Sequence, residues 1–171
     1  NNMGGVAGQY KTPAIATQMS FFFTNTMQTS PYRGFGRPEA TYVIERLIDQ
    51  AARETGRDAL WLRQQNLVSP DAMPYQTALT FLYDCGDFPR IVAAAAKNAD
   101  YAGFAERRKD SESRGLLRGI GIANPIEVAG GPLKQVRKDI ARITVRPDGH
   151  IVITPGLMSV GQGHETALSR M

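Results

Sequence analysis

The spacing of hydrophobic positions along this chain changes from a helical to an alternating period near residue 115. Between residues 38 and 55 apolar side chains recur three and four positions apart, which predicts a helix with one buried face. Pro38 and Glu39 suit its first turn, and Gly56 suits its end. The apolar positions of this helix are Ala40, Val43, Ile44, Leu47, Ile48, Ala51 and Ala52.

Three further helices are predicted before residue 115, over residues 58–67, 87–98 and 100–113. Asp58 and Asp87 are placed to cap the first two, because a carboxylate can accept hydrogen bonds from the free N–H groups of a first turn. The prolines between residues 68 and 84 predict a loop there, with at most one short strand. Residues 14–27 are a weaker candidate for a strand.

Beyond Gly115 the alternation predicts strands. One is expected over residues 117–122, and a hairpin is expected over residues 135–154, from Gln135 to Thr154, around the turn Pro147-Asp148-Gly149. A loop over residues 156–163 then leads into a helix that begins at His164 and that the chain does not finish. The fold class is therefore expected to be mixed α/β (α+β), with residues 1–105 ending one domain and residues 106–171 starting another.

Composition and charge exclude several classes of protein. The 171 residues are 42% apolar and 21% charged, which is typical of a soluble globular protein. The 20 basic and 16 acidic side chains give a net charge of +4, but the arginines are scattered, so no nucleic-acid partner is expected. No apolar run approaches the roughly 20 residues of a membrane span. The chain lacks an initiator methionine and stops just after a helix start, so we expect a fragment.

Two glycine-containing loops could carry chemistry. In Tyr32-Arg33-Gly34-Phe35-Gly36-Arg37, the glycines permit close backbone approach to a ligand, and the following helix start favours an electronegative group. The alternative is a tight loop with Phe35 as a core plug and both arginines solvated. The loop Gly161-Gln162-Gly163 has the same pattern before His164, with the alternative of a simple turn that leaves Gln162 exposed.

No metal site is expected from the residues themselves. His164-Glu165 lacks the spacing of a zinc motif, and the single cysteine, Cys85, has no second thiol with which to form a disulfide or a metal site. Neither glycine loop has P-loop or dinucleotide-binding spacing, so a phosphate- or nucleotide-binding module is the least favoured hypothesis.

In this order, the two loops resemble those of the molybdenum-binding large subunit of the xanthine dehydrogenase and aldehyde oxidase family. The first is similar to that family's Arg-Gly-Phe-Gly loop, and the second to its Gly-Gln-Gly loop. The intervening segments "RPEATYVIERLIDQAARETGRDALWLRQQNL" and "RGIGIANPIEVAGG" are also similar to the family, so the resemblance covers nearly the whole chain. It implies a fragment that spans the junction of two molybdopterin-binding domains.

The resemblance assigns roles to particular residues. It implies that Arg33, Gly34 and the triplet Gly161, Gln162 and Gly163 bind a molybdenum-molybdopterin cofactor, expected in its cytosine dinucleotide form. It implies that Phe35 faces the substrate and that residues 127–131 lie near the substrate pocket. The family's catalytic glutamate lies outside this chain, so no catalytic residue and no direct metal ligand are assigned here.

The resemblance also implies partners and a reaction. Full-length members are cytoplasmic oxidoreductases that use water as the oxygen source, with an iron–sulfur subunit holding [2Fe–2S] clusters and a FAD subunit, expected as a dimer of heterotrimers. The loop is similar to that of carbon monoxide dehydrogenase-like large subunits but lacks their copper-binding cysteine. An aldehyde, an N-heterocycle or a related small molecule is therefore the expected substrate. The fragment alone is expected to be inactive, and the alternative is a non-catalytic structural or partner-binding domain that retains the fold.

Overall fold

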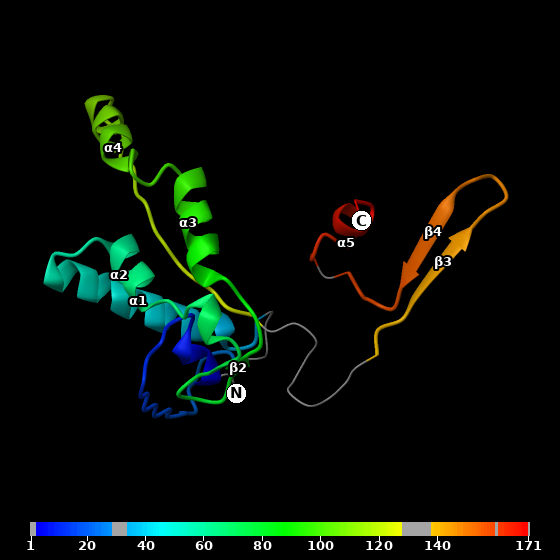
Figure 1. Cartoon of the computed structure of the whole chain (residues 1–171), viewed down its shortest axis with the longest axis horizontal. Coiled ribbons are helices and arrows are strands. Elements are labelled where there is room, and N and C mark those ends of the chain that lie inside the picture. The colour runs from blue at the N-terminus through cyan, green and yellow to red at the C-terminus, as the bar shows by residue number, and fades with distance from the viewer. Residues whose placement is uncertain (1–2, 29–33, 128–137, 160, 171) are drawn as a thin grey trace. The chain divides into compact units, whose positions relative to one another are not determined.

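The computed structural model describes residues 3–28, 34–127, 138–159 and 161–170, and the chain divides into two compact units, Asn1–Glu127 and Val128–Met171 (Figure 1). The first unit contains four α-helices and two short strands among its described residues, and the second contains a β-hairpin and one short helix. Helices and strands together confirm the predicted mixed α/β class.

The first long helix, α1 (Arg37–Thr55), lies where the apolar spacing predicts it. Its ends are set by left-handed glycines, Gly36 with φ 87° and Gly56 with φ 63°. The buried face is narrower than the apolar stripe, because Val43 and Leu47 are 49% and 56% exposed. Their predicted burial is therefore wrong, because the covered flank is the one that contacts the 3-10 helix η1 (Met3–Ala7) and the next helix, α2 (Ala59–Asn66).

Helix α2 (Ala59–Asn66) lies beside α1 (Figure 1). Its predicted N-cap is confirmed, since the Asp58 carboxylate accepts a hydrogen bond from the Trp61 N–H at 2.7 Å. After α2 the chain pairs with the N-terminal segment, where the Lys11 N–H donates to the Asn66 carbonyl at 2.9 Å. The core cluster forms around this pairing and consists of Tyr10, Leu67, Val68, Tyr83, Phe88 and Val92.

The segment between α2 and the next helix contains more strand than predicted. After a 3-10 turn (η2, Pro70–Ala72), β1 (Tyr75–Gln76) and β2 (Leu82–Tyr83) form a short antiparallel pair. The prediction of at most one strand missed this pair. The Tyr83 ring connects it to the core by contacting Phe88 edge-on at a centroid distance of 5.9 Å.

Two more helices follow. Helix α3 (Phe88–Asn98) begins after its predicted cap, since the Asp87 carboxylate accepts from the Arg90 N–H at 3.1 Å. Helix α4 (Phe104–Ser113) begins later than predicted because Asp100 has a φ of 45°, which cannot continue a right-handed helix.

Two predicted strands are wrong. Residues 14–27 form no strand, and neither do residues 117–122, which lie within the extended segment 116–127. This segment has no partner strand among the described residues. Its Ile122 and Pro125 carbonyls accept hydrogen bonds from the side chains of Arg63 and Gln9 instead.

The second unit contains the predicted hairpin, formed by β3 (Ala141–Val145) and β4 (Ile151–Pro155). Strand β3 begins at Ala141, later than the predicted hairpin start at Gln135, and residues 135–137 lie outside the described residues. The predicted turn is confirmed, since Gly149 has a φ of 84° and its N–H donates to the Arg146 carbonyl at 2.9 Å. One face of the hairpin is wholly apolar and carries Ala141, Ile143, Val145, Ile151, Ile153 and Pro155.

The last helix, α5 (His164–Leu168), starts at the predicted residue but ends with Ser169 as its C-cap, so the expected continuation to the end of the chain is wrong. None of the described helices is long and apolar enough to cross a bilayer.

Candidate functional site

The turn before α1 has an unusual backbone. Gly34, Phe35 and Gly36 all have positive φ angles, of 90°, 41° and 87°. The Arg37 N–H closes the turn by donating to the Gly34 carbonyl at 3.0 Å. A Cβ atom on Gly34 would lie 2.6 Å from Pro38 Cδ, so only glycine fits there.

This geometry corrects one expectation about the helix start. The first turn of α1 offers fewer free N–H groups than predicted, because the Arg37 N–H is used inside the turn and Pro38 has none. A ligand at this end of α1 would meet the turn and its side chains more than the helix backbone.

Phe35 projects from this turn and is 50% exposed. The alternative that it is a core plug is therefore wrong in this structure. Its positive φ of 41° is rare for a residue with a side chain, so the turn holds Phe35 in a strained backbone conformation. Arg33, the predicted cofactor-binding arginine of the same loop, lies outside the described residues.

Arg37 connects the turn to the end of the first unit. Its side chain is only 18% exposed, and its Nε lies 2.8 Å from Glu127 Oε1. The two groups form an ion pair, although the Nε–H does not point at the carboxylate well enough for a hydrogen bond. The alternative that both loop arginines are solvated is wrong for Arg37. Glu127 lies beside the loop, but residues 128–131 lie outside the described residues, so the expected place of residues 127–131 near a substrate pocket stays a prediction.

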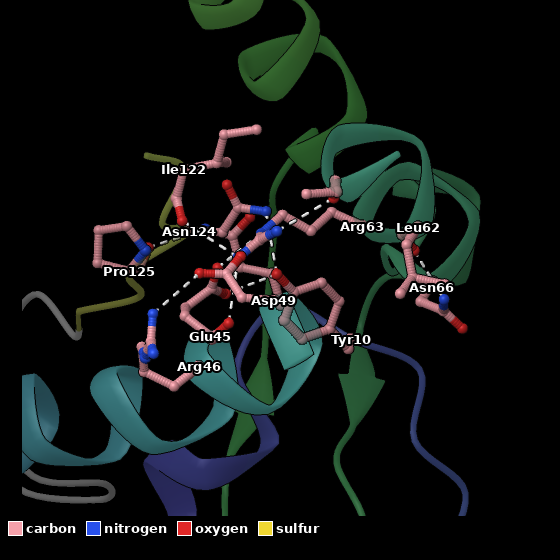
Figure 2. A network of polar contacts seen from close by, with 12 residues as sticks. Tyr10, Glu45, Arg46, Asp49, Leu62, Arg63, Asn66, Ile122, Asn124 and Pro125 are labelled. Carbon is pink, nitrogen blue, oxygen red and sulfur yellow. Dashed lines mark hydrogen bonds and ion pairs between the residues drawn. The ribbon is translucent and has the colours of Figure 1, made fainter. Parts of the chain in front are cut away.

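A buried cluster around Arg63 holds α1, α2 and the segment 116–127 together (Figure 2). The Arg63 side chain is fully buried, and it donates to Glu45 Oε2 and to Asp49 Oδ1, each at 2.8 Å. It also donates to the Ala59, Glu45 and Ile122 carbonyls at 3.1, 3.2 and 3.1 Å. The guanidinium is therefore satisfied on every nitrogen.

The electrostatics of this cluster favour the charged arginine. Burial by itself lowers the pKa of Arg63, but its hydrogen bonds to Glu45 and Asp49 outweigh that effect and raise it. The Tyr10 hydroxyl donates to Glu45 Oε1 at 2.6 Å and accepts from Asn124 Nδ2 at 3.2 Å. Burial, followed by the hydrogen bond to Glu45, raises the pKa of Tyr10, so its hydroxyl stays protonated and keeps donating.

Sequence reasoning did not identify this cluster. Arg63 stands out in the sequence only as the first letter of an "RxxNL" segment, and Glu45 only as an interruption of the apolar stripe of α1. The available signal was a carboxylate on a buried helix face with a second carboxylate, Asp49, one turn later. Such a pair predicts a buried cationic partner, but not which arginine supplies it.

In the second unit, Gly161 and Gly163 flank Gln162 with φ angles of 95° and 74°. Gly163 is the N-cap of α5, and no atom lies within 4 Å of the place where its Cβ would be. The Gln162 side chain is exposed, and its Nε2 donates to the Met158 carbonyl at 3.3 Å. Its role in cofactor binding stays a prediction.

A cavity of about 420 Å³ opens beside the C-terminal end of α1, but it contains none of the residues predicted to contact cofactor or substrate. It is lined by Asp49, Ala52, Arg53, Gly56, Arg57, Ala59, Tyr101, Ile120, Gly121 and Ile122.

Among the residues that the structure describes, no three His, Cys, Asp or Glu side chains are grouped to hold a metal ion. Cys85 is exposed, and a hydrogen bond to the neighbouring Asp84 raises the pKa of its thiol, which disfavours the reactive thiolate.

Comparison with known protein families gives two matches. The profiles of two molybdopterin cofactor-binding domains match residues 1–67 and residues 94–171. The carbon monoxide dehydrogenase large chain of Hydrogenophaga pseudoflava is 30% identical over 96% of this chain and 22% of its own length.

Two solved structures have a similar fold. Carbon monoxide dehydrogenase from Oligotropha carboxidovorans is 34% identical, with a TM-score of 0.56 over 77% of this chain and 18% of that one. Quinoline 2-oxidoreductase from Pseudomonas putida 86 is 28% identical, with a TM-score of 0.62 over 81% of this chain and 19% of that one. The chain thus spans about a fifth of the length of the relatives it matches.

Proposed function

Because two molybdopterin cofactor-binding segments make up most of this chain, the chain belongs to that domain family, and we propose that it forms part of the large subunit of a molybdenum hydroxylase. In this proposal residues 1–105 end the first cofactor-binding domain and residues 106–171 begin the second. The fragment alone is inactive, because the family's catalytic glutamate lies outside it.

The residues present are compatible with a pterin cofactor. Gly163 leaves open space where a Cβ would stand, and Gln162 offers an amide at the tip of an exposed loop. We assign cofactor contacts to Arg33, Gly34 and the triplet 161–163, whose peptide N–H and amide groups suit the hydrogen-bonding edges of a pterin and its phosphates. When bound, the cofactor supplies the two-electron oxidation of the substrate.

The proposed cofactor is the molybdopterin cytosine dinucleotide, with FAD and [2Fe–2S] clusters on two partner subunits. The full-length protein is proposed to be a cytoplasmic dimer of heterotrimers. These features come from the resemblance, and the chain's own residues support only the pterin contacts.

The proposed substrate is an aldehyde or an N-heterocycle. The observation that carries this proposal is the turn Gly34-Phe35-Gly36, which holds an aromatic ring half-exposed. One related structure is described as a copper- and molybdenum-containing carbon monoxide dehydrogenase. Here the described loop positions 34–37 hold no thiol, and Cys85 follows the separate strand β2, so copper chemistry on carbon monoxide is not proposed. A planar heterocycle or an aldehyde could instead stack on the Phe35 ring.

Replacing Phe35 by alanine in the longer subunit tests this role. The change removes the ring that would stack on the substrate, so kcat/KM is expected to fall by about tenfold or more, while molybdenum content per chain stays at the wild-type level. Steady-state kinetics with an aromatic aldehyde and with quinoline, together with metal analysis, measure both quantities.

Tyr42→Ala is the matched control, because Tyr42 is an aromatic residue of α1 that is 68% exposed and lies outside the turn. It should leave kcat/KM unchanged. Equal kcat/KM for Phe35→Ala and the wild type would remove the substrate-facing role. A native protein without molybdenum would overturn the proposed function as a whole.

A further inference from the structure

The segment 116–127 runs along α1 in the opposite direction and is connected to it at both ends of their overlap. Towards the middle of α1, Arg63 binds Glu45, Asp49 and the Ile122 carbonyl. At the start of α1, Arg37 pairs with Glu127. The first connection is buried and has many hydrogen bonds, whereas the second lies next to the turn and includes the ion pair between Arg37 and Glu127.

We propose that Arg37 and Glu127 form a positioning pair, which fixes the turn Gly34-Phe35-Gly36 against the end of the segment 116–127 and so sets where the Phe35 ring stands. The effect of this pair on substrate rests on the proposed function, whereas its effect on the position of the turn does not. Neither residue is assigned a contact with substrate or cofactor.

The contacts make Arg37 an effective anchor for the turn. Its backbone N–H donates to the Gly34 carbonyl, and its guanidinium contacts Glu127, so one residue closes the turn and holds it to the neighbouring segment. The side chain is 18% exposed and its Nε is buried, so removing the carboxylate leaves a largely buried cation that must move towards water. Movement of Arg37 would carry the turn with it.

Exchanging the two charges separates a role in charge pairing from a role in shape. If the pair acts through its charges, exchanging both charges should restore the position of the turn. If either residue acts through its shape, the exchange should not restore it. Arg108 on α4 is the matched control, since it pairs with Glu112 at 2.9 Å but is 60% exposed and lies away from the turn.

The first experiment follows amide hydrogen exchange in the chain itself and needs no cofactor. The Arg37 and Ala40 amides donate to the Gly34 and Gly36 carbonyls, so they report on the turn. Arg37→Gln and Glu127→Gln should each speed exchange of the amides at positions 37 and 40 by about tenfold, and the double variant Arg37→Glu with Glu127→Arg should return it to within about threefold of the wild type. Arg108→Gln should change nothing there. Unchanged exchange in the single variants, failure of the reversal, or an equal rise throughout α3 would each overturn the proposal.

The second experiment asks whether the positioning matters for substrate. In the longer subunit, Glu127→Gln should lower kcat/KM for quinoline by about tenfold more than for a small aliphatic aldehyde, at unchanged molybdenum content, because a displaced ring misaligns the wide substrate most. An equal fall for both substrates would overturn the link to substrate. A wild-type protein without molybdenum would overturn the proposed function and leave the exchange result standing.

Discussion

At the scale of single residues, Arg63 shows how a buried charge can stabilise this fold. Its planar guanidinium donates to two carboxylates and three carbonyls, so each of its three nitrogens is paired with an oxygen atom. Glu45 is 4% exposed, and it also accepts a hydrogen bond from Tyr10. Neither Arg63 nor Glu45 could stay buried without the other.

Arg63→Ala is expected to lower the free energy of unfolding by roughly 3–5 kcal/mol, because it leaves the Glu45 carboxylate buried without a cation. Arg108→Ala, at an exposed pair, should cost less than about 1 kcal/mol. Urea unfolding followed by circular dichroism measures both. A loss for Arg63→Ala as small as that of Arg108→Ala would mean that the cluster contributes little.

At the scale of elements, the turn glycine Gly34 before α1 and the C-cap glycine Gly56 after it both have positive φ angles, of 90° and 63°, but different surroundings. At Gly56 no atom lies within 4 Å of the place where a methyl group would stand, whereas a methyl group on Gly34 would collide with Pro38. Both positions need a left-handed backbone, but only Gly34 also needs the absence of a side chain.

Gly56→Ala should therefore cost about 1–2 kcal/mol, the penalty of placing alanine in a left-handed conformation. Gly34→Ala should perturb the turn more, since the same penalty is joined by a collision with the Pro38 ring. Amide chemical shifts of residues 34–37 and 39 should change widely in Gly34→Ala and stay near wild type in Gly56→Ala. Equal perturbation of the turn by both variants would contradict this expectation.

Sequence periodicity located α1, α2, α3 and the β3–β4 hairpin because each depends on local spacing and on a cap or turn next to it. It failed for residues 117–122, where alternating apolar residues suggested a strand but no partner strand is present among the described residues. The turn at Gly34-Phe35-Gly36 was recognisable from its glycines. The pairing of Arg37 with Glu127 was not, because nothing local links residues so far apart in the chain.

At the scale of the whole molecule, the two units have different internal support. The first unit has a core cluster and the buried Arg63 contacts. In the second unit, every residue of β3 is exposed, and Ile143 and Val145 are 67% and 70% exposed. A two-stranded hairpin without a covered face is marginally stable in water.

Hydrogen exchange should separate the two units. Amides in the middle of α1 are expected to exchange at least about a hundredfold more slowly than those of β3 and β4, which lack buried contacts. Mass spectrometry of peptic fragments after timed labelling measures this difference. Equal protection of β3 and α1 would show that the hairpin has support that its exposed strands do not indicate.

The contacts of Arg63 also imply an order of folding. Its partners Glu45 and Asp49 are 18 and 14 residues away, but Ile122 is 59 residues away, and the Tyr10–Asn124 contact spans 114. Short loops close at a lower entropic cost than long ones, so we expect α1 and α2 to meet first. At that stage Arg63 can already bind Glu45 and Asp49, while its contact with the Ile122 carbonyl is still missing. We therefore expect the segment 116–127 to dock onto a nucleus that already exists, so a nascent chain could prepare this site before residues 116–127 have been synthesised.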